Sequence, residues 1–218
     1  MSSSRDAVAA RRAPRGGRQK ERSRATRARI LEAGTALFLR DGYQATTMAA
    51  IAAEAGVAVQ SLYLRFGSKL DILKAAFDVA VVGDDEPVPL LEREWVRQFA
   101  RIQNGPEAVR LFVAEVGRVL GRTQPIYAVV QAAASSEAGD LLAQSKQQRH
   151  AGIRAIAEGL SRKPGFADGL SVDTAADLMY GLISEDHYGL LVADRGWAPD
   201  EWERWWGDIL VGILFPRG

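Results

Sequence analysis

The chain has 218 residues, 47% of them hydrophobic, which is enough for one large domain or two smaller ones with a buried core. It contains no cysteine, so disulfides, thiolate metal sites and cysteine nucleophiles are excluded. No apolar run reaches the ~18 residues of a membrane span, and the charged N-terminus lacks the apolar segment of a signal peptide, so we expect a cytoplasmic protein.

Charge is distributed unevenly along the chain. Residues 1–75 hold 14 Lys and Arg against 6 Asp and Glu, a net charge of +8, whereas residues 76–218 hold 14 against 21, a net charge of −7. A basic first third on an acidic body is typical of a protein that turns one end toward phosphate. Residues 1–21 are predicted to be a disordered basic arm, and the alternative is a plain solvated tail.

The first predicted helix spans about residues 22–40 and is stopped by Gly42. Its early residues Arg24 and Arg27 are expected to lie near a DNA duplex. Its buried stripe comprises Ile30, Ala33, Leu37 and Phe38.

Two short helices joined by a tight turn are predicted over residues 49–55 and 58–66. Thr47 can cap the first helix, because its hydroxyl can accept a bond from an otherwise unpaired backbone N–H. Gly56 can adopt the left-handed conformation that a helix end requires. The pattern predicts a helix-turn-helix, whose second helix enters the DNA major groove. The alternative is a common helical hairpin with a glycine turn.

The next predicted helix runs to about Val82, and the pair Ser68 and Asp71 resembles a capping box at its start. The segment 83–87, Gly-Asp-Asp-Glu-Pro, breaks that helix and marks a joint between domains. We therefore divide the chain into an arm (1–21), a helix-turn-helix domain (22–82) and a second domain (83–218).

The second domain is helical by pattern, with proline and glycine punctuation and no alternation typical of strands. Its helices are predicted over about residues 90–103, 106–121, 125–135, 137–161, 172–194 and 200–214. The fold class is therefore all-α, with about nine to ten helices in total.

Catalytic and metal chemistry find little support in the sequence. The two histidines, His150 and His187, fall on different predicted helices, and His187 is interpreted as a polar interface residue. The chain has no glycine-rich phosphate loop, no Gly-x-Ser-x-Gly elbow and no His-Glu-x-x-His motif. We expect no catalytic residues, no metal and no cofactor.

The helix-turn-helix carries a distinctive set of residues, which are Gly42-Tyr43, Thr46-Thr47, Ile51-Ala52, Ala55-Gly56-Val57, Leu62-Tyr63, Phe66 and Lys69. This set resembles the DNA-binding domain of the TetR family of bacterial transcriptional regulators, over about residues 22–82. The resemblance implies an N-terminal three-helix DNA-binding domain, followed by an α-helical domain for ligand binding and dimerisation. Ala58, Gln60, Leu64 and Arg65 depart from the commoner family residues, which affects the expected operator sequence rather than the fold.

In such proteins the body holds a small-molecule cavity, mostly apolar with a few polar anchors. Bulky apolar residues on the helices of this body are the candidate liners, and the alternative is that they are plain core. The candidates are Trp95, Phe99, Phe112, Val116, Tyr127, Val130 and Met179.

The last two predicted helices have apolar stripes too wide for a helix with a single buried face. In the resembled family these helices pair in a four-helix dimer interface. The residues expected in that interface are Leu178, Leu182, Trp202, Trp206, Ile209 and Ile213.

The sequence and its family resemblance together predict a repressor that binds a palindromic operator as a homodimer and is released by a small-molecule effector. We expect the effector to act through the fourth helix, by changing the spacing of the two recognition helices. Phosphate contacts are expected from Thr47, Tyr63 and Lys69, and contacts to base edges or the adjacent backbone from Val59, Gln60, Ser61 and Arg65. The alternatives are an activator or effector-independent regulator, a helical interaction module without a DNA role and, less well supported, a small-molecule enzyme.

Overall fold

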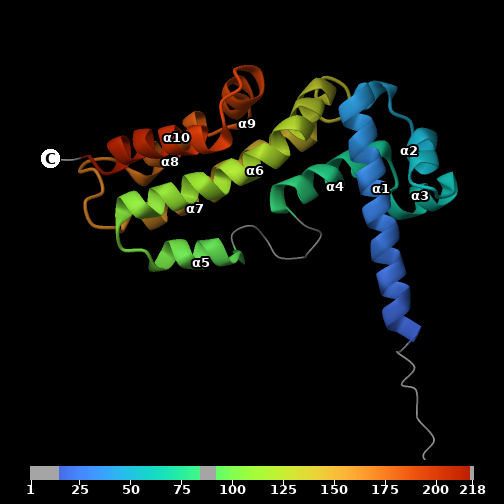
Figure 1. Cartoon of the computed structure of the whole chain (residues 1–218), viewed down its shortest axis with the longest axis horizontal. Coiled ribbons are helices and arrows are strands. Elements are labelled where there is room, and N and C mark those ends of the chain that lie inside the picture. Colours follow the sequence, from blue (N-terminus) through green and yellow to red (C-terminus); the bar gives the residue numbers. More distant parts are fainter. Residues whose placement is uncertain (1–14, 84–91, 217–218) are drawn as a thin grey trace, which may run out of the picture.

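A computed structural model describes residues 15–83 and 92–216, and every regular element in these ranges is helical. The elements are α1 (Arg15–Ala45), α2 (Met48–Glu54), α3 (Val59–Phe66), α4 (Lys69–Val82), α5 (Glu94–Arg101), α6 (Gly105–Ala133), α7 (Gly139–Ser161), α8 (Val172–Leu182), α9 (Glu185–Tyr188), the π-helix η2 (Gly189–Asp194) and α10 (Pro199–Leu214). We call α1–α4 the head and α5–α10 with η2 the body. The long helix α6 runs from the body to the head, where it meets α1 and α4 (Figure 1).

Helix α1 is longer than the sequence analysis predicted. It begins at Arg15, so residues 15–21 are helical and not part of an arm, whereas residues 1–14 of the predicted arm lie outside the described residues. Residues 19–22, Gln-Lys-Glu-Arg, are good helix formers that let the helix extend beyond its packed part. The predicted break at Gly42 is confirmed, because Gly42 has a φ of 78° inside the helical segment.

The helix-turn-helix forms as predicted. The Thr47 hydroxyl accepts a 3.1 Å hydrogen bond from the backbone N–H of Ala50 and caps α2. Gly56 has a φ of 63°, the left-handed conformation that lets the chain turn toward α3. Leu62 is fully buried and fixes α3 against the rest of the head.

Helix α4 is defined by local signals at both ends. The Ser68 hydroxyl accepts a 3.1 Å hydrogen bond from the N–H of Asp71, which confirms the predicted cap. Gly83 ends the helix in the left-handed conformation. Residues 84–91, which include most of the predicted joint, lie outside the described residues.

Two helices that were predicted separately in the body form a single helix. Residues 106–121 and 125–135 were expected to be separate, but α6 continues through Pro125. A proline inside a helix removes one backbone hydrogen bond, and packing can offset that loss. Leu120 and Ile126, on either side of the proline, are both buried, so the two halves are held in one rod.

One predicted helix of the body is three. The segment 172–194 divides into α8, α9 and η2, because Ile183 and Ser184 adopt extended conformations. The Ser184 hydroxyl accepts a hydrogen bond from the N–H of His187, so a new helix starts there. The other predicted body helices exist with shifted ends, and α5 is shorter than predicted.

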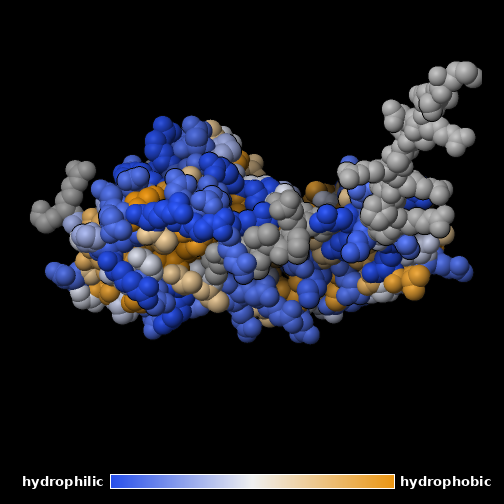
Figure 2. All heavy atoms as spheres, turned by 90° about the horizontal axis from the view of Figure 1, so that it is seen from below, coloured by the Kyte–Doolittle hydropathy of each residue, from blue (hydrophilic) through white to orange (hydrophobic). Residues whose placement is uncertain are grey.

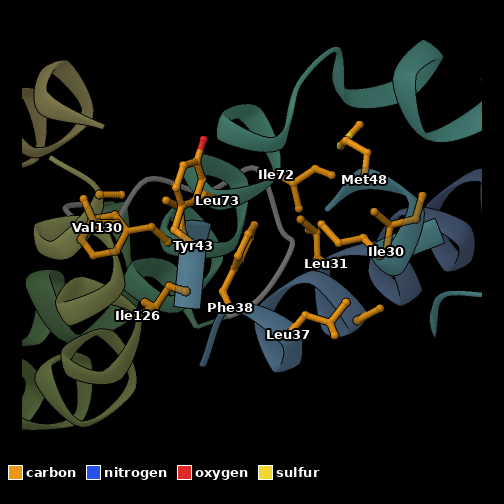
Figure 3. Close-up of a cluster of buried hydrophobic side chains, with 14 of the residues drawn as sticks. Ile30, Leu31, Leu37, Phe38, Tyr43, Met48, Ile72, Leu73, Ile126 and Val130 are labelled. Carbon is orange, nitrogen blue, oxygen red and sulfur yellow. The ribbon is translucent and has the colours of Figure 1, made fainter. Parts of the chain in front are cut away.

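Two apolar clusters form the core. The head cluster joins residues of α1–α4 to Ile126, Tyr127 and Val130 of α6, and Figure 3 shows Ile126 and Val130 beside Tyr43. The body cluster lies among α5–α8 and α10. Hydrophilic residues cover most of the face seen in Figure 2, and hydrophobic residues gather mainly over the body at the left. None of the described helices is long and apolar enough to cross a membrane.

Candidate nucleic-acid interface

Helix α3 presents an almost complete exposed face to solvent. Its exposed residues are Val59, Gln60, Ser61, Tyr63, Leu64 and Arg65. Leu64 is 90% exposed and lies four residues after Gln60, so the two share the centre of the face opposite the buried Leu62. Leu64 was not among the predicted site residues, although this four-residue spacing would have indicated it.

The side chains expected at phosphates come from the start of α2, from α3 and from the start of α4. Thr47 is exposed at the start of α2, and Tyr63 is 52% exposed on α3. Lys69 is half-buried, with Nζ donating a 2.8 Å hydrogen bond to the backbone carbonyl of Tyr43 and lying 4.1 Å from the centre of the Tyr43 ring. That carbonyl accepts from one of the three N–H donors of the ammonium group. The contact therefore positions Lys69 and leaves two N–H groups for other acceptors.

A basic cavity of about 370 Å³ lies between α1 and α3. Its lining residues are Lys20, Ser23, Arg24, Arg27, Arg65 and Phe66. The structure thus brings Arg24 and Arg27 of α1 together with Arg65 of α3, which are far apart in the sequence. No carboxylate is among the described residues that line it, so the cavity is an attractive place for an anion.

Contacts between side chains orient two of these arginines. Arg65 Nη1 donates a 3.0 Å hydrogen bond to Ser23 Oγ, which turns the guanidinium toward α1 and away from the centre of the α3 face. The Arg27 guanidinium lies 5.2 Å from the centre of the Phe66 ring, a cation–π contact. Arg65 therefore lies beside the cavity rather than beside Gln60.

Hydrogen bonds and ring packing connect the head to the body. The Tyr43 hydroxyl donates to Glu137 and the Gln44 side-chain amide to Ser136, both in the turn between α6 and α7. On α4, the Phe77 ring packs at 6.2 Å against the ring of Tyr127 of α6. The last turn of α4 is held as well, because Arg122 donates hydrogen bonds to the carbonyls of Ala80 and Val81.

The seven predicted pocket liners do not surround one cavity. Phe99, Phe112 and Met179 are buried in the body cluster, with Trp95 and Val116 packed against it. Tyr127 and Val130 belong to the head cluster. Helical spacing alone could not separate these core positions from cavity walls.

A second cavity, of about 280 Å³, lies between α6 and the segment of α9 and η2. Tyr127 is the one predicted liner that it includes. The residues that line it are Gln124, Tyr127, Ala128, Gln131, Glu185, Asp186, Gly189, Leu190 and Asp194. Burial, with the carboxylates of Glu185 and Asp186, raises the pKa of Tyr127 to about 12.

The predicted dimer residues divide into two groups. Trp202 and Trp206 are 0% and 7% exposed within a single chain, so they are core residues and their assignment to an interface is corrected. Leu178 on α8 remains exposed, while Leu182, Ile209 and Ile213 are half-buried. Trp205, which was not among the predicted interface residues, is 48% exposed, because it lies on the side of α10 away from the body cluster.

The two histidines make local contacts. His150 Nε2 lies 3.0 Å from Asp177 Oδ1, and His187 Nδ1 lies 3.0 Å from the carbonyl oxygen of Leu182. The His187 ring also stacks on Trp206. Among the residues that the structure describes, no group of three or more His, Asp and Glu is arranged to hold a metal ion.

Comparison with known proteins finds relatives that match the helix-turn-helix region. The family model described as bacterial regulatory proteins, tetR family, matches residues 30–76, which extend from α1 into α4. The chain is 36% identical over 109 residues to the HTH-type transcriptional repressor KstR of Rhodococcus jostii strain RHA1. That match covers 48% of this chain and 43% of the Rhodococcus protein, so the chain matches less than half of that relative's length.

Solved structures share the whole fold. NalD of Pseudomonas aeruginosa, the secondary repressor of the MexAB-OprM multidrug efflux pump, has a TM-score of 0.64 at 19% identity, covering 90% of this chain and all of NalD. The fatty acid degradation regulator FadR of Bacillus halodurans has a TM-score of 0.67 at 18% identity, covering 85% of this chain and 94% of FadR. Such low identities show the fold alone, whereas the family-model match lies on the helix-turn-helix itself. Over residues 30–76, which carry the helix-turn-helix, the chain is therefore similar to the bacterial regulatory proteins of the tetR family.

Proposed function

We propose that the protein is a transcriptional repressor that binds a palindromic operator as a homodimer in the cytoplasm and is released by a small-molecule effector. The observation that carries the DNA-binding part is the exposed face of α3 beside a cavity lined by Lys20, Arg24, Arg27 and Arg65. A helix that reads bases needs such an exposed face, and cations next to it hold the DNA backbone in register. The relative named KstR is a transcriptional repressor, which supports the direction of regulation.

Within this proposal the residues of the head have different tasks. Thr47, Tyr63 and Lys69 contact phosphates at the edges of the α3 face. Arg24, Arg27 and Arg65 hold a further phosphate at the basic cavity. Val59, Gln60, Ser61 and Leu64 face base edges, where Gln60 can pair with adenine N6 and N7 and an apolar side chain can contact a thymine methyl group.

Dimerisation is part of the proposal because one recognition helix reads few bases. A two-fold partner supplies a second helix about one helical turn away, ~34 Å along the duplex. Exposed Leu178 and Trp205 support an interface on α8 and α10, with half-buried Leu182, Ile209 and Ile213 beside them. Burying these side chains against a partner stabilises a dimer by roughly 25 cal/mol per Å² before the cost of association.

Release by an effector is supported by the position of the second cavity. Tyr127 lines that cavity and packs against Phe77 of α4, the helix that follows the recognition helix in the chain. A ligand that binds better when Tyr127 is displaced shifts α4 and with it α3. Such a ligand must bind the state that cannot hold DNA better than the state that can.

The experiment is operator selection from random duplexes, followed by a retardation assay and footprinting. We expect a palindrome protected on two half-sites. Replacing Tyr63 with alanine should weaken binding to specific and random DNA alike, whereas Gln60→Ala should change base preference more than non-specific affinity. A chain that retards no DNA even at low salt contradicts the proposal and favours a helical interaction module.

A further inference from the structure

Glu185, the first residue of α9, is a buried carboxylate whose negative charge is only partly offset by the groups around it. Its side chain is 6% exposed, and its Oε2 atom has no hydrogen-bond partner. The nearest cation is Arg149, whose Nε lies 3.6 Å from Oε2, beyond hydrogen-bond distance. Arg149 Nη1 donates instead to the carbonyls of Tyr180 and Ile183, so this arginine offsets the charge without satisfying the carboxylate.

The second cavity collects further negative charge around Glu185. Asp186 and Asp194 also line it, and its described lining residues include no Lys or Arg. Gln131 Nε2 donates a 3.1 Å hydrogen bond to Asp186, which leaves the charge in place. Burial raises the pKa of Glu185 despite the opposing effect of Arg149, so the charged form of this carboxylate is costly in the folded protein.

The remaining walls suit an organic ligand. Tyr127 offers a ring on which a cation can lie, and Leu190 adds an apolar side chain to the lining. The volume of about 280 Å³ is at the lower end of the ~300–1,000 Å³ that small-molecule sites occupy. A compact ligand with one charged group fits these limits.

We propose that this cavity binds a small organic cation, a protonated amine or a quaternary ammonium, with the carboxylate of Glu185 as its counter-ion. A protonated amine supplies a hydrogen-bond donor and a second cation for the Oε2 atom, which Arg149 approaches only to 3.6 Å. The inference rests on the proposed function only for its regulatory consequence, since the binding itself does not need DNA.

Three probes of one size and different charge test the site. Benzylamine is cationic at pH 7, benzyl alcohol is neutral and benzoate is anionic. By calorimetry on the full chain without DNA, benzylamine should bind about tenfold or more tightly than the other two. Equal affinity for all three probes, or no binding of any, overturns the proposal.

Variants assign the preference to the cavity. Glu185→Gln keeps the shape and should abolish the preference for benzylamine, and Asp194→Asn should reduce it if the first variant does not fold. Glu203→Gln is the matched control, because burial also raises the pKa of that carboxyl while it lies outside the cavity lining. Benzylamine binding that survives both cavity variants unchanged contradicts the assigned site.

A retardation assay without any probe separates this inference from the proposed function. A chain that binds its operator but does not prefer benzylamine overturns the cation site and leaves DNA binding intact. A chain that prefers benzylamine through Glu185 but binds no DNA supports the site and overturns the repressor. If both hold, benzylamine should lower operator affinity in the parent chain and not in Glu185→Gln.

Discussion

The hydroxyl of Tyr43, near the end of α1, donates a 2.5 Å hydrogen bond to Oε2 of Glu137, in the turn between α6 and α7. The carbonyl and ring of the same tyrosine hold Lys69, at the start of α4. One residue thus connects the body, the first helix of the head and the helix that follows the recognition helix.

Replacing Tyr43 with phenylalanine removes this hydrogen bond and keeps the ring. We expect the free energy of unfolding to fall by about 1 kcal/mol, because Glu137 loses a donor. The midpoint of thermal unfolding should fall by roughly 2–4 °C for a chain of this size. Tyr63→Phe, at an exposed tyrosine on α3, is the matched control and should leave the midpoint unchanged. Equal midpoints for the two variants would show that the Tyr43 bond adds nothing.

Alkaline pH should destabilise the protein through its buried tyrosines. Burial and the nearby carboxylates raise the pKa of Tyr127 to about 12, above the value of about 10 expected in the unfolded chain. A raised pKa in the folded state contributes stability that is complete below pH ~10 and is lost as the pH rises toward 12, by up to ~1.4 kcal/mol per pH unit. Urea unfolding measured between about pH 8 and about pH 11 should show this loss of stability. Tyr127→Phe should make the loss smaller. An identical pH dependence in the variant would contradict the assignment.

Leu64 should read thymine methyl groups. At 90% exposure it lies beside Gln60 on the face of α3 that is proposed to enter the major groove. Replacing one thymine at a time by uracil in the selected operator removes only the methyl group. We expect one such position to weaken binding of the parent chain and to have no effect on Leu64→Ala. Leu39→Ala, at an exposed leucine of α1, is the control and should respond to uracil like the parent. If every position behaves alike in the parent and Leu64→Ala, the leucine reads no methyl group.

The basic cavity should appear in the salt dependence of DNA binding. Each phosphate contact contributes a log–log slope of about −0.9, because it releases condensed counterions. Arg24→Ala and Arg65→Ala should therefore each make the slope shallower by about one such unit. Arg97→Ala on α5, an exposed arginine paired with Glu94, should not.

Deletion of residues 1–14 applies the same measurement to the predicted arm. A shallower slope means that the arm touches DNA, and an unchanged slope and affinity support the plain-tail alternative.

A charge in the proposed dimer interface should abolish operator binding without touching the head. Leu178→Glu and Trp205→Glu change exposed positions of α8 and α10, so each single chain should still fold. Sedimentation at micromolar protein should then show monomers that no longer bind a palindrome tightly. Leu39→Glu is the control for an added surface charge on α1. A parent chain that sediments as a folded monomer and still binds a palindrome tightly would contradict the proposed interface.

The sequence by itself determined the head. The cap at Thr47, the left-handed Gly56 and the cap at Ser68 were all predicted and are all present. These signals act over three or four residues, where backbone hydrogen bonding and sterics decide the conformation without help from distant parts of the chain.

Only the tertiary structure decided the body. An apolar residue at helical spacing can be a core residue, a cavity wall or part of an interface, and its neighbours on other helices determine which. Trp202 is fully buried while Trp205, three residues later, is half exposed, because α10 turns one side to the body cluster. Pro125 remains inside a helix because packing on both sides holds it. Glu185 and Tyr127 line one cavity only after α9 folds against α6, so no local pattern could have indicated that cavity.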